Sequence, residues 1–258
     1  MIRGQDIASA DLDIRKYVIR IAAEVGEVLS DRLAGLYLHG SLATGSFFRH
    51  ASDIDVLILV DGPLPAATLG ALDRKLHELD RSRPSKGVLE VSVVQAAHAR
   101  RYEHPIQVEL QLNSSPAAVP AQLLHVRQRS LRVTGDEPAH AVGAIPWFAF
   151  MDSVRHEFEA KAQQIETRPV SVIFNACRTL HDATVSSVEI LSKIEAAEWA
   201  RNVVPQECVA LIDDALEVYV KNASRNFDRS AIERLRQFVA GRAAPAFEKV
   251  RDTGEDDE

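Results

Sequence analysis

The sequence is poor in cysteine, with only Cys177 and Cys208 among its 258 residues, and no Cys-x-x-Cys pair or Cys/His cluster surrounds either. A disulfide framework and a structural zinc site are therefore not expected. Both cysteines lie in apolar stretches of helical periodicity, so we expect two small buried side chains. The nine histidines form no His-x-x-x-His or His-Glu-x-x-His pair, which argues against a histidine metal site.

Long apolar runs are also missing. The strongest run, residues 56–60, lies between Asp55 and Asp61, whereas a membrane-spanning helix needs about 20 apolar residues. The first residues contain no apolar signal region. We therefore expect a cytoplasmic protein with no membrane partner.

Positive charge is not in excess. Lys and Arg total 30 against 37 Asp and Glu, which gives a net charge of −7. Because nucleic acids are bound by clustered Lys and Arg, this balance argues against a nucleic-acid partner. A cationic or neutral small partner suits it better. The last seven residues, 252–258, are expected to form a solvated acidic tail.

Apolar spacing divides the chain into two parts. Up to about residue 115 it predicts the order helix, strand, turn, strand, helix, strand, strand. Segment 116–144 contains three prolines and two glycines and is expected to add a helix and a linker. From about residue 145 only helical spacing occurs, so we predict a second, helical domain. The predicted segments are helix 11–30, strands 36–38 and 54–60, helix 69–79, strands 88–94 and 106–112, and helices 148–164, 170–185, 209–219 and 232–239.

One segment carries a pattern that indicates chemistry. Gly40-Ser41 is followed after eleven residues by Asp53-Ile54-Asp55. Small residues at the end of a strand allow backbone N–H groups to approach a phosphate closely. Asp53 and Asp55 are two apart at the start of an apolar strand, so both carboxylates are expected on one face. Such like charges are costly unless neutralised, and Mg²⁺ would do so with room for nucleotide phosphates.

This pattern resembles the signature of the polymerase-β-like nucleotidyltransferase superfamily. An Asp-x-Asp alone is common, but Gly-Ser at this distance and between apolar segments makes the match specific. The superfamily uses a third carboxylate on a neighbouring strand, for which Glu90 and Glu109 are both candidates. That carboxylate could complete a metal site or act as general base on an attacking hydroxyl.

A closer resemblance is to the aminoglycoside 3″-adenylyltransferases, which modify streptomycin and spectinomycin. Glu90-Val91-Ser92 is similar to a Glu-Val-Thr strand that supplies their catalytic base, which favours Glu90. Segment 108–111, Val-Glu-Leu-Gln, is similar to a later family segment, so Glu109 is expected to be structural or at the substrate edge.

The resemblance extends into the helical half. Residues 192–200 resemble a segment in which a Lys contacts the ATP phosphates, which implies that role for Lys193. Arg178 is similar to a helix Arg near the nucleotide, although a gap of two residues is needed. Ser52 joins Gly40 and Ser41 as an implied nucleotide contact.

Other positions depart from the family or remain open. Ser115 stands where the family has a Trp that contacts streptomycin, and no clean match exists for an acidic, Trp-containing loop. Asp182 is a candidate substrate ligand because His181-Asp182 could face a cleft between domains. The identity of the antibiotic therefore stays open.

The resemblance implies an α+β fold, with a polymerase-β-like nucleotidyltransferase domain over 1–144 including the linker. A helical bundle over 145–251 and the tail 252–258 follow. The implied reaction is AMP transfer from Mg-ATP to a hydroxyl of a streptomycin- or spectinomycin-type aminoglycoside, with release of pyrophosphate. The acceptor would lie between the domains. Alternatives are another small acceptor, a protein acceptor, or an inactive nucleotide-binding relative, and GTP in place of ATP is not distinguished.

Overall fold

The computed structural model of the chain describes residues 3–185 and 189–255, with side chains described up to residue 250. The chain divides into two compact units, one of residues 3–145 and one beginning at Pro146. Within the described residues, no helix combines the length and apolar character needed to cross a membrane.

The first unit mixes helices and strands in nearly the predicted order. Its elements are α1 (Leu12–Leu29), η1 (Ser30–Arg32), β1 (Leu33–His39), α2 (Gly40–Thr44), β2 (Ile54–Val60), α3 (Ala66–Arg81), β3 (Leu89–Gln95), α4 (Ala96–Arg100), β4 (Val108–Leu112), η2 (Pro116–Ala118), α5 (Val119–Arg129), β5 (Leu131–Gly135) and α6 (Pro138–Ala141).

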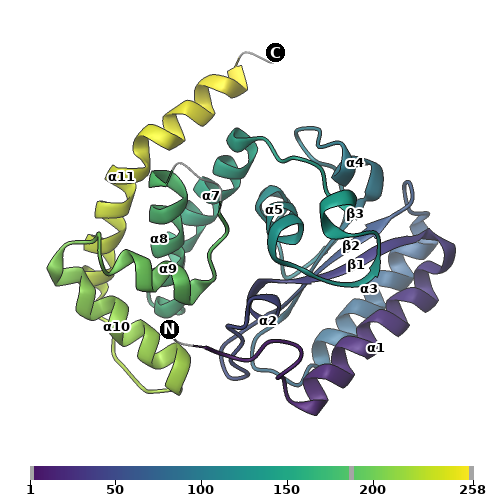
Figure 1. Cartoon of the computed structure of the whole chain (residues 1–258), viewed down its shortest axis with the longest axis horizontal. Helices are drawn as coiled ribbons and strands as arrows, with labels where there is room; N and C mark the ends of the chain where they lie inside the picture. The colour runs from purple at the N-terminus through teal and green to yellow at the C-terminus, as the bar shows by residue number, and fades with distance from the viewer. Residues whose placement is uncertain (1–2, 186–188, 256–258) are drawn as a thin grey trace. The chain divides into compact units, whose positions relative to one another are not determined.

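The five strands form one mixed sheet in the order β4-β3-β2-β1-β5. β2 and β3 are parallel, and the other neighbours are antiparallel. A parallel pair needs a crossover connection, and α3 supplies it between β2 and β3. Figure 1 shows α1 and α3 side by side along one face of the sheet, with α5 on the other face.

Both faces of the central strand β2 are buried. Ile54, Val56 and Ile58 belong to the core beneath α1 and α3. Leu57 and Leu59 alternate with them and belong to the core on the opposite face, beneath α5. A strand covered on both faces reads as a continuous apolar run, which is why it was recognisable in the sequence.

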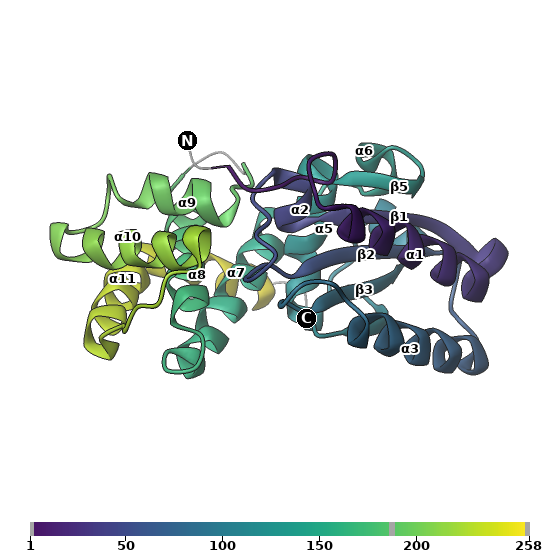
Figure 2. The same ribbon diagram turned by 90° about the horizontal axis from the view of Figure 1, so that it is seen from below.

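The segment predicted as a helix and a linker, 116–144, is more than a connection. It forms α5 and also β5, which pairs antiparallel with β1 and completes the sheet (Figure 2). β5 was not predicted because its side chains are half-buried or exposed and include Arg132 and Thr134. Edge strands of this kind carry polar residues and give a weak apolar signal.

The second unit is helical, as predicted. Its elements are α7 (Trp147–Lys161), η3 (Ala162–Gln164), α8 (Pro169–Thr184), α9 (Lys193–Ala200), α10 (Gln206–Lys221) and α11 (Arg229–Glu255). α8 contacts each of the other four α-helices, and its buried side chains form the centre of this unit. α11 continues through Pro245 to Glu255, so residues 252–255 of the predicted acidic tail are helical. Residues 256–258 lie outside the described residues.

The two cysteines provide a test of this core. Both are free and buried, as predicted. Burial raises the pKa of the Cys177 thiol to about 12 and also raises that of Cys208. Because the thiolate is the nucleophile, both thiols should resist alkylation at pH 8.

We therefore predict that iodoacetamide at pH 8 leaves the native chain unmodified. Mass spectrometry after urea unfolding should then find two carbamidomethyl groups. Modification of the native protein at the rate of a free thiol would show that this core is wrongly described.

Candidate active site

The turn after β1 is built around Gly40. This residue has a backbone φ of +63° and opens the short helix α2. A Cβ atom at this position would collide with the carboxylate of Asp55. Only glycine therefore allows that carboxylate to lie against the turn, which explains the residue type in physical terms.

The next residue, Ser41, has a buried hydroxyl group that lacks a hydrogen bond among the described residues. A buried polar atom left in that state is costly. The hydroxyl thus fits a site in which a bound group supplies the missing partner.

The sheet register brings two of the predicted carboxylates together. Asp55 pairs with Glu90 in the parallel ladder of β2 and β3. Paired residues on adjacent strands lie about 4.8 Å apart along the hydrogen-bonding direction and share a face. Asp55 and Glu90 are therefore neighbours on the face opposite to Ile54 and Val56.

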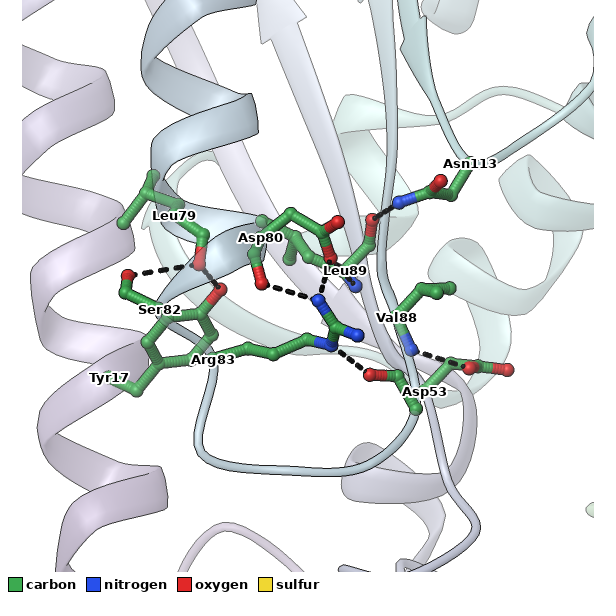
Figure 3. Close-up of polar contacts among 10 residues, drawn as sticks. Tyr17, Asp53, Leu79, Asp80, Ser82, Arg83, Val88, Leu89 and Asn113 are labelled. Atoms are coloured by element: carbon green, nitrogen blue, oxygen red, sulfur yellow. Dashed lines mark hydrogen bonds and ion pairs between the residues drawn. The ribbon is translucent and has the colours of Figure 1, made fainter.

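Asp53 lies one residue before β2. Its Oδ1 accepts a hydrogen bond of 2.9 Å from the Val88 N–H, just before β3 (Figure 3). Asp53 is thus tied to the entry of the same strand that carries Glu90. Ser52 is fully buried, and its Oγ accepts a 2.9 Å bond from the Phe48 N–H, which closes the preceding turn.

His39 does not offset the negative charge at this site. It is opposite Asp55 in the β1–β2 ladder. Its ring is buried, and burial lowers its pKa to about 4. The imidazole is therefore neutral at pH 7, and the carboxylates gain no positive charge from it.

Polar side chains hold Glu90 in place. Its Oε1 accepts hydrogen bonds from Gln122 Nε2 at 2.8 Å and from Ser114 Oγ at 3.3 Å. Ser92 Oγ donates to Gln122 Oε1 at 2.7 Å. Sequence reasoning missed Gln122, although a signal existed. Gln122 interrupts the apolar helical stripe that Val119 begins, and a polar residue in such a stripe needs a partner.

Glu109 does not join this group. It lies at an irregularity of the β3–β4 ladder, opposite Val93 and Val94. Its Oε1 accepts from Gln95 Nε2 at 2.5 Å, and its Oε2 accepts from the Leu64 N–H at 3.0 Å. Both oxygens therefore serve contacts near the other end of β3.

Asp53 and Asp55 could hold Mg²⁺ only as part of a shell that substrate phosphates and water complete. Within 3–185 and 189–255, no three His, Cys, Asp or Glu side chains are placed to hold a metal ion by themselves. Mg²⁺ typically takes one or two carboxylates from a protein and completes its shell with substrate phosphates and water. Asp53 and Asp55 offer these hard oxygen ligands.

The second unit contains the predicted basic residues. Lys193 is the first residue of α9, which begins with a capping box between Ser192 and Glu195. Arg178 on α8 lies 3.2 Å from Glu157. Lys161, which sequence reasoning missed, lies near both. Burial lowers the pKa of its ammonium, the charge of Glu157 opposes that shift, and the charges of Lys193 and Arg178 add to it. Crowded cations of this kind favour an anionic ligand.

Asp182 is also in this unit, on α8. It is largely buried, with its side chain 14% exposed, and lies 3.0 Å from His181 Nδ1. Burial raises the pKa of its carboxyl group, while His181 and Arg178 oppose that shift. A cationic ligand group would stabilise its charged form.

A mixed sheet with paired acidic residues after a Gly-Ser turn is typical of the nucleotidyltransferases. Residues 19–125 match the family model for the nucleotidyltransferase domain, and residues 141–243 match the one for the aminoglycoside adenylyltransferase C-terminal domain. The chain belongs to the aminoglycoside adenylyltransferase family. The resemblance seen in the sequence is confirmed at this level, and the chain is an adenylyltransferase.

Similar proteins agree with this assignment. Spectinomycin 9-adenylyltransferase of Staphylococcus aureus is 26% identical over 217 residues, covering 76% of this chain and 81% of that protein. The enzyme of the same name from Campylobacter jejuni is 24% identical over 218 residues, covering 78% and 83%. A solved structure of a spectinomycin adenyltransferase from Enterococcus faecialis, with ATP and spectinomycin, aligns at a TM-score of 0.75. It is 16% identical and covers 89% of this chain and 99% of that one, which confirms the predicted fold.

The contact between Gly40 and Asp55 generates a prediction with a matched control. Gly40→Ala and Gly45→Ala both place a side chain at a positive φ, of +63° and +71°. Each should cost about 1–2 kcal/mol, lowering the melting temperature by a few degrees. Only at Gly40 does the new Cβ displace the Asp55 carboxylate, since nothing lies within 4 Å of a Cβ at Gly45.

Gly40→Ala should therefore lose adenylyl transfer by more than 100-fold, whereas Gly45→Ala should stay within a few-fold of the wild type. Equal activity of the two variants, measured as pyrophosphate release, would contradict this account of Gly40.

Proposed function

We propose that this enzyme transfers AMP from Mg-ATP to a hydroxyl of spectinomycin or a related aminoglycoside. The observation that carries the proposal is the β2–β3 register, which sets Glu90 beside Asp55. A site for a metal–triphosphate and a general base are then adjacent on one face of the sheet.

Asp53 and Asp55 would hold Mg²⁺, together with the phosphates of ATP. Bound there, Mg²⁺ supplies positive charge that neutralises the triphosphate and the charge developing at the α-phosphoryl group. Gly40, Ser41 and Ser52 are the proposed phosphate contacts of this unit. The buried, unpartnered hydroxyl of Ser41 supports its inclusion.

Glu90 is the proposed general base. Its carboxylate accepts the proton of the acceptor hydroxyl, and the acceptor oxygen forms a bond to the α-phosphorus. The bond from the α-phosphorus to the bridging oxygen breaks, and pyrophosphate leaves with that electron pair. Gln122 holds Glu90 Oε1 at 2.8 Å, so the carboxylate is oriented before the acceptor arrives.

Lys193 and Arg178 are the proposed nucleotide contacts of the helical unit. Their proximity to Lys161 supports this role, because a triphosphate would add to the compensation that Glu157 already gives these cations. Asp182 is the proposed contact for a cationic group of the acceptor. Because ATP is the co-substrate, we place the reaction in the cytoplasm.

Spectinomycin is the acceptor we favour over streptomycin. Ser115, which precedes η2, lacks the aromatic ring that the resemblance associates with streptomycin. The similar proteins named above are spectinomycin enzymes. The net charge of −7 suits a cationic acceptor of either kind.

The deciding experiment measures pyrophosphate release from Mg-ATP with spectinomycin, streptomycin, other aminoglycosides and lincosamides, with a parallel GTP series. Mass spectrometry would identify the acceptor that gains AMP. We expect a spectinomycin product with ATP. Bound ATP with no product across the panel would overturn the proposed acceptor and favour another small molecule or a protein.

A second experiment distinguishes the two candidate bases. Glu90→Gln should lower kcat by 10²–10⁴-fold while the variant still binds Mg-ATP. Glu109→Gln removes a charge from the contacts with Gln95 and Leu64, so it should lower the melting temperature and leave kcat within a few-fold. The reverse pattern would assign the base to Glu109.

A further inference from the structure

The turn between α3 and β3 delivers the hydrogen bond that Asp53 receives. The Val88 N–H that donates to Asp53 belongs to the same peptide group as the Gly87 carbonyl. The next peptide group joins the Val88 carbonyl, which accepts from the Ile54 N–H at 2.9 Å, to the Leu89 N–H. The orientation of Asp53 thus depends on how these two peptide groups are held.

Arg83 and Asp80, near the end of α3, hold both groups (Figure 3). Arg83 Nε donates to the Gly87 carbonyl, and its Nη1 donates to Asp80 O at 2.6 Å and to Asp80 Oδ1 at 3.1 Å. Asp80 Oδ1 accepts from the Leu89 N–H at 2.8 Å. The peptide groups on either side of Val88 are therefore clamped by one ion pair.

The turn packs tightly against the segment that leads into Asp53, so a movement of the turn would also move Asp53. A Cβ atom at Gly87 would collide with the Ser52 carbonyl, so the turn passes directly against the chain that leads into Asp53. The Lys86 N–H donates to the Arg49 carbonyl at 3.0 Å on the same side. A shift of the Gly87–Val88 peptide group would be transmitted to Asp53.

We propose that Arg83 is a positioning residue for Asp53, acting through the Gly87–Val88 peptide group. A cation on the carbonyl of a peptide polarises it and strengthens the hydrogen bond that its N–H donates. Arg83 would thereby fix Asp53 Oδ1, and Oδ2 would be the oxygen of this carboxylate that binds Mg²⁺. This inference rests on the proposed role of Asp53 in holding Mg²⁺.

The test measures how much Mg²⁺ increases the affinity of the chain for ATP, which we call the Mg²⁺-dependent gain. Isothermal titration calorimetry of the whole chain would give the Kd for ATP with excess Mg²⁺ and in EDTA. Arg83→Met should reduce the Mg²⁺-dependent gain by about 10-fold, as expected when a partner of a metal ligand is lost. The Kd for metal-free ATP should not change, which a purely structural loss would not predict.

Two variants calibrate this result. Asp53→Asn should remove most of the gain. Arg32→Met is the matched control, because the Arg32 guanidinium also reaches loop carbonyls, those of Asp61 and Pro63 at 3.4 Å, but at the other end of β2. It should keep the gain of the wild type at a comparable melting temperature.

The outcomes separate the two proposals. If Asp53→Asn loses the gain and Arg83→Met keeps it, the role of Arg83 is overturned and the metal site stands. If Asp53→Asn keeps the gain, the proposed metal site is wrong, and the inference about Arg83 falls with it. If Arg83→Met does not fold, Asp80→Asn decides: it retains an acceptor for the Leu89 N–H but loses the charge that holds Arg83. An unchanged gain in Asp80→Asn also overturns the proposal.

Discussion

The repulsion between acidic side chains on β2 and β3 is the constraint around which the first unit is built. Asp55 and Glu90 are set side by side by a ladder whose other members, apart from Ser92 and Gln95, are buried apolar residues. Because the register cannot slip without exposing that core, the sheet can hold two negative charges together. The stability of the apolar strands thus offsets an arrangement that is unfavourable until cations arrive.

A different contact fixes the orientation of each of the three carboxylates. Asp55 lies against a turn that only glycine permits. Asp53 accepts a hydrogen bond from a backbone N–H, and Glu90 accepts one from the side-chain amide of Gln122. These three contacts come from a glycine turn, a backbone amide and a side-chain amide, all of which are neutral. Under the proposed function, a bound metal ion would supply positive charge beside these carboxylates.

Much of this arrangement was predictable because it depends on local pattern. The apolar run of β2, the Gly-Ser turn and the spacing of the two aspartates all lie within residues 40–60. The choice between Glu90 and Glu109 was different. Alternation alone places both on a polar face, and the preference for Glu90 came from the family resemblance. The structure adds the physical difference: Glu90 pairs with Asp55, while Glu109 lies at a ladder irregularity with other partners.

The remaining features were not predictable because they join distant parts of the chain. Arg83 acts on a peptide group that only the folded turn brings beside Asp53, and no spacing rule marks that contact. Lys161 was missed because the cations that lie near it, Arg178 and Lys193, belong to other helices, α8 and α9. β5 is an edge strand whose partner, β1, lies about a hundred residues earlier in the chain.

The late position of β5 has a consequence for synthesis on the ribosome. β1 is the second strand from one edge of the sheet and leads directly into Gly40. Until residues 131–135 have been made, the outer backbone groups of β1 have no strand to pair with. The nascent first unit therefore presents an open sheet edge next to the turn at Gly40, and unpaired edges recruit other strands. β5, whose exposed polar side chains suit an edge strand, covers β1 only after the proposed catalytic carboxylates have been synthesised.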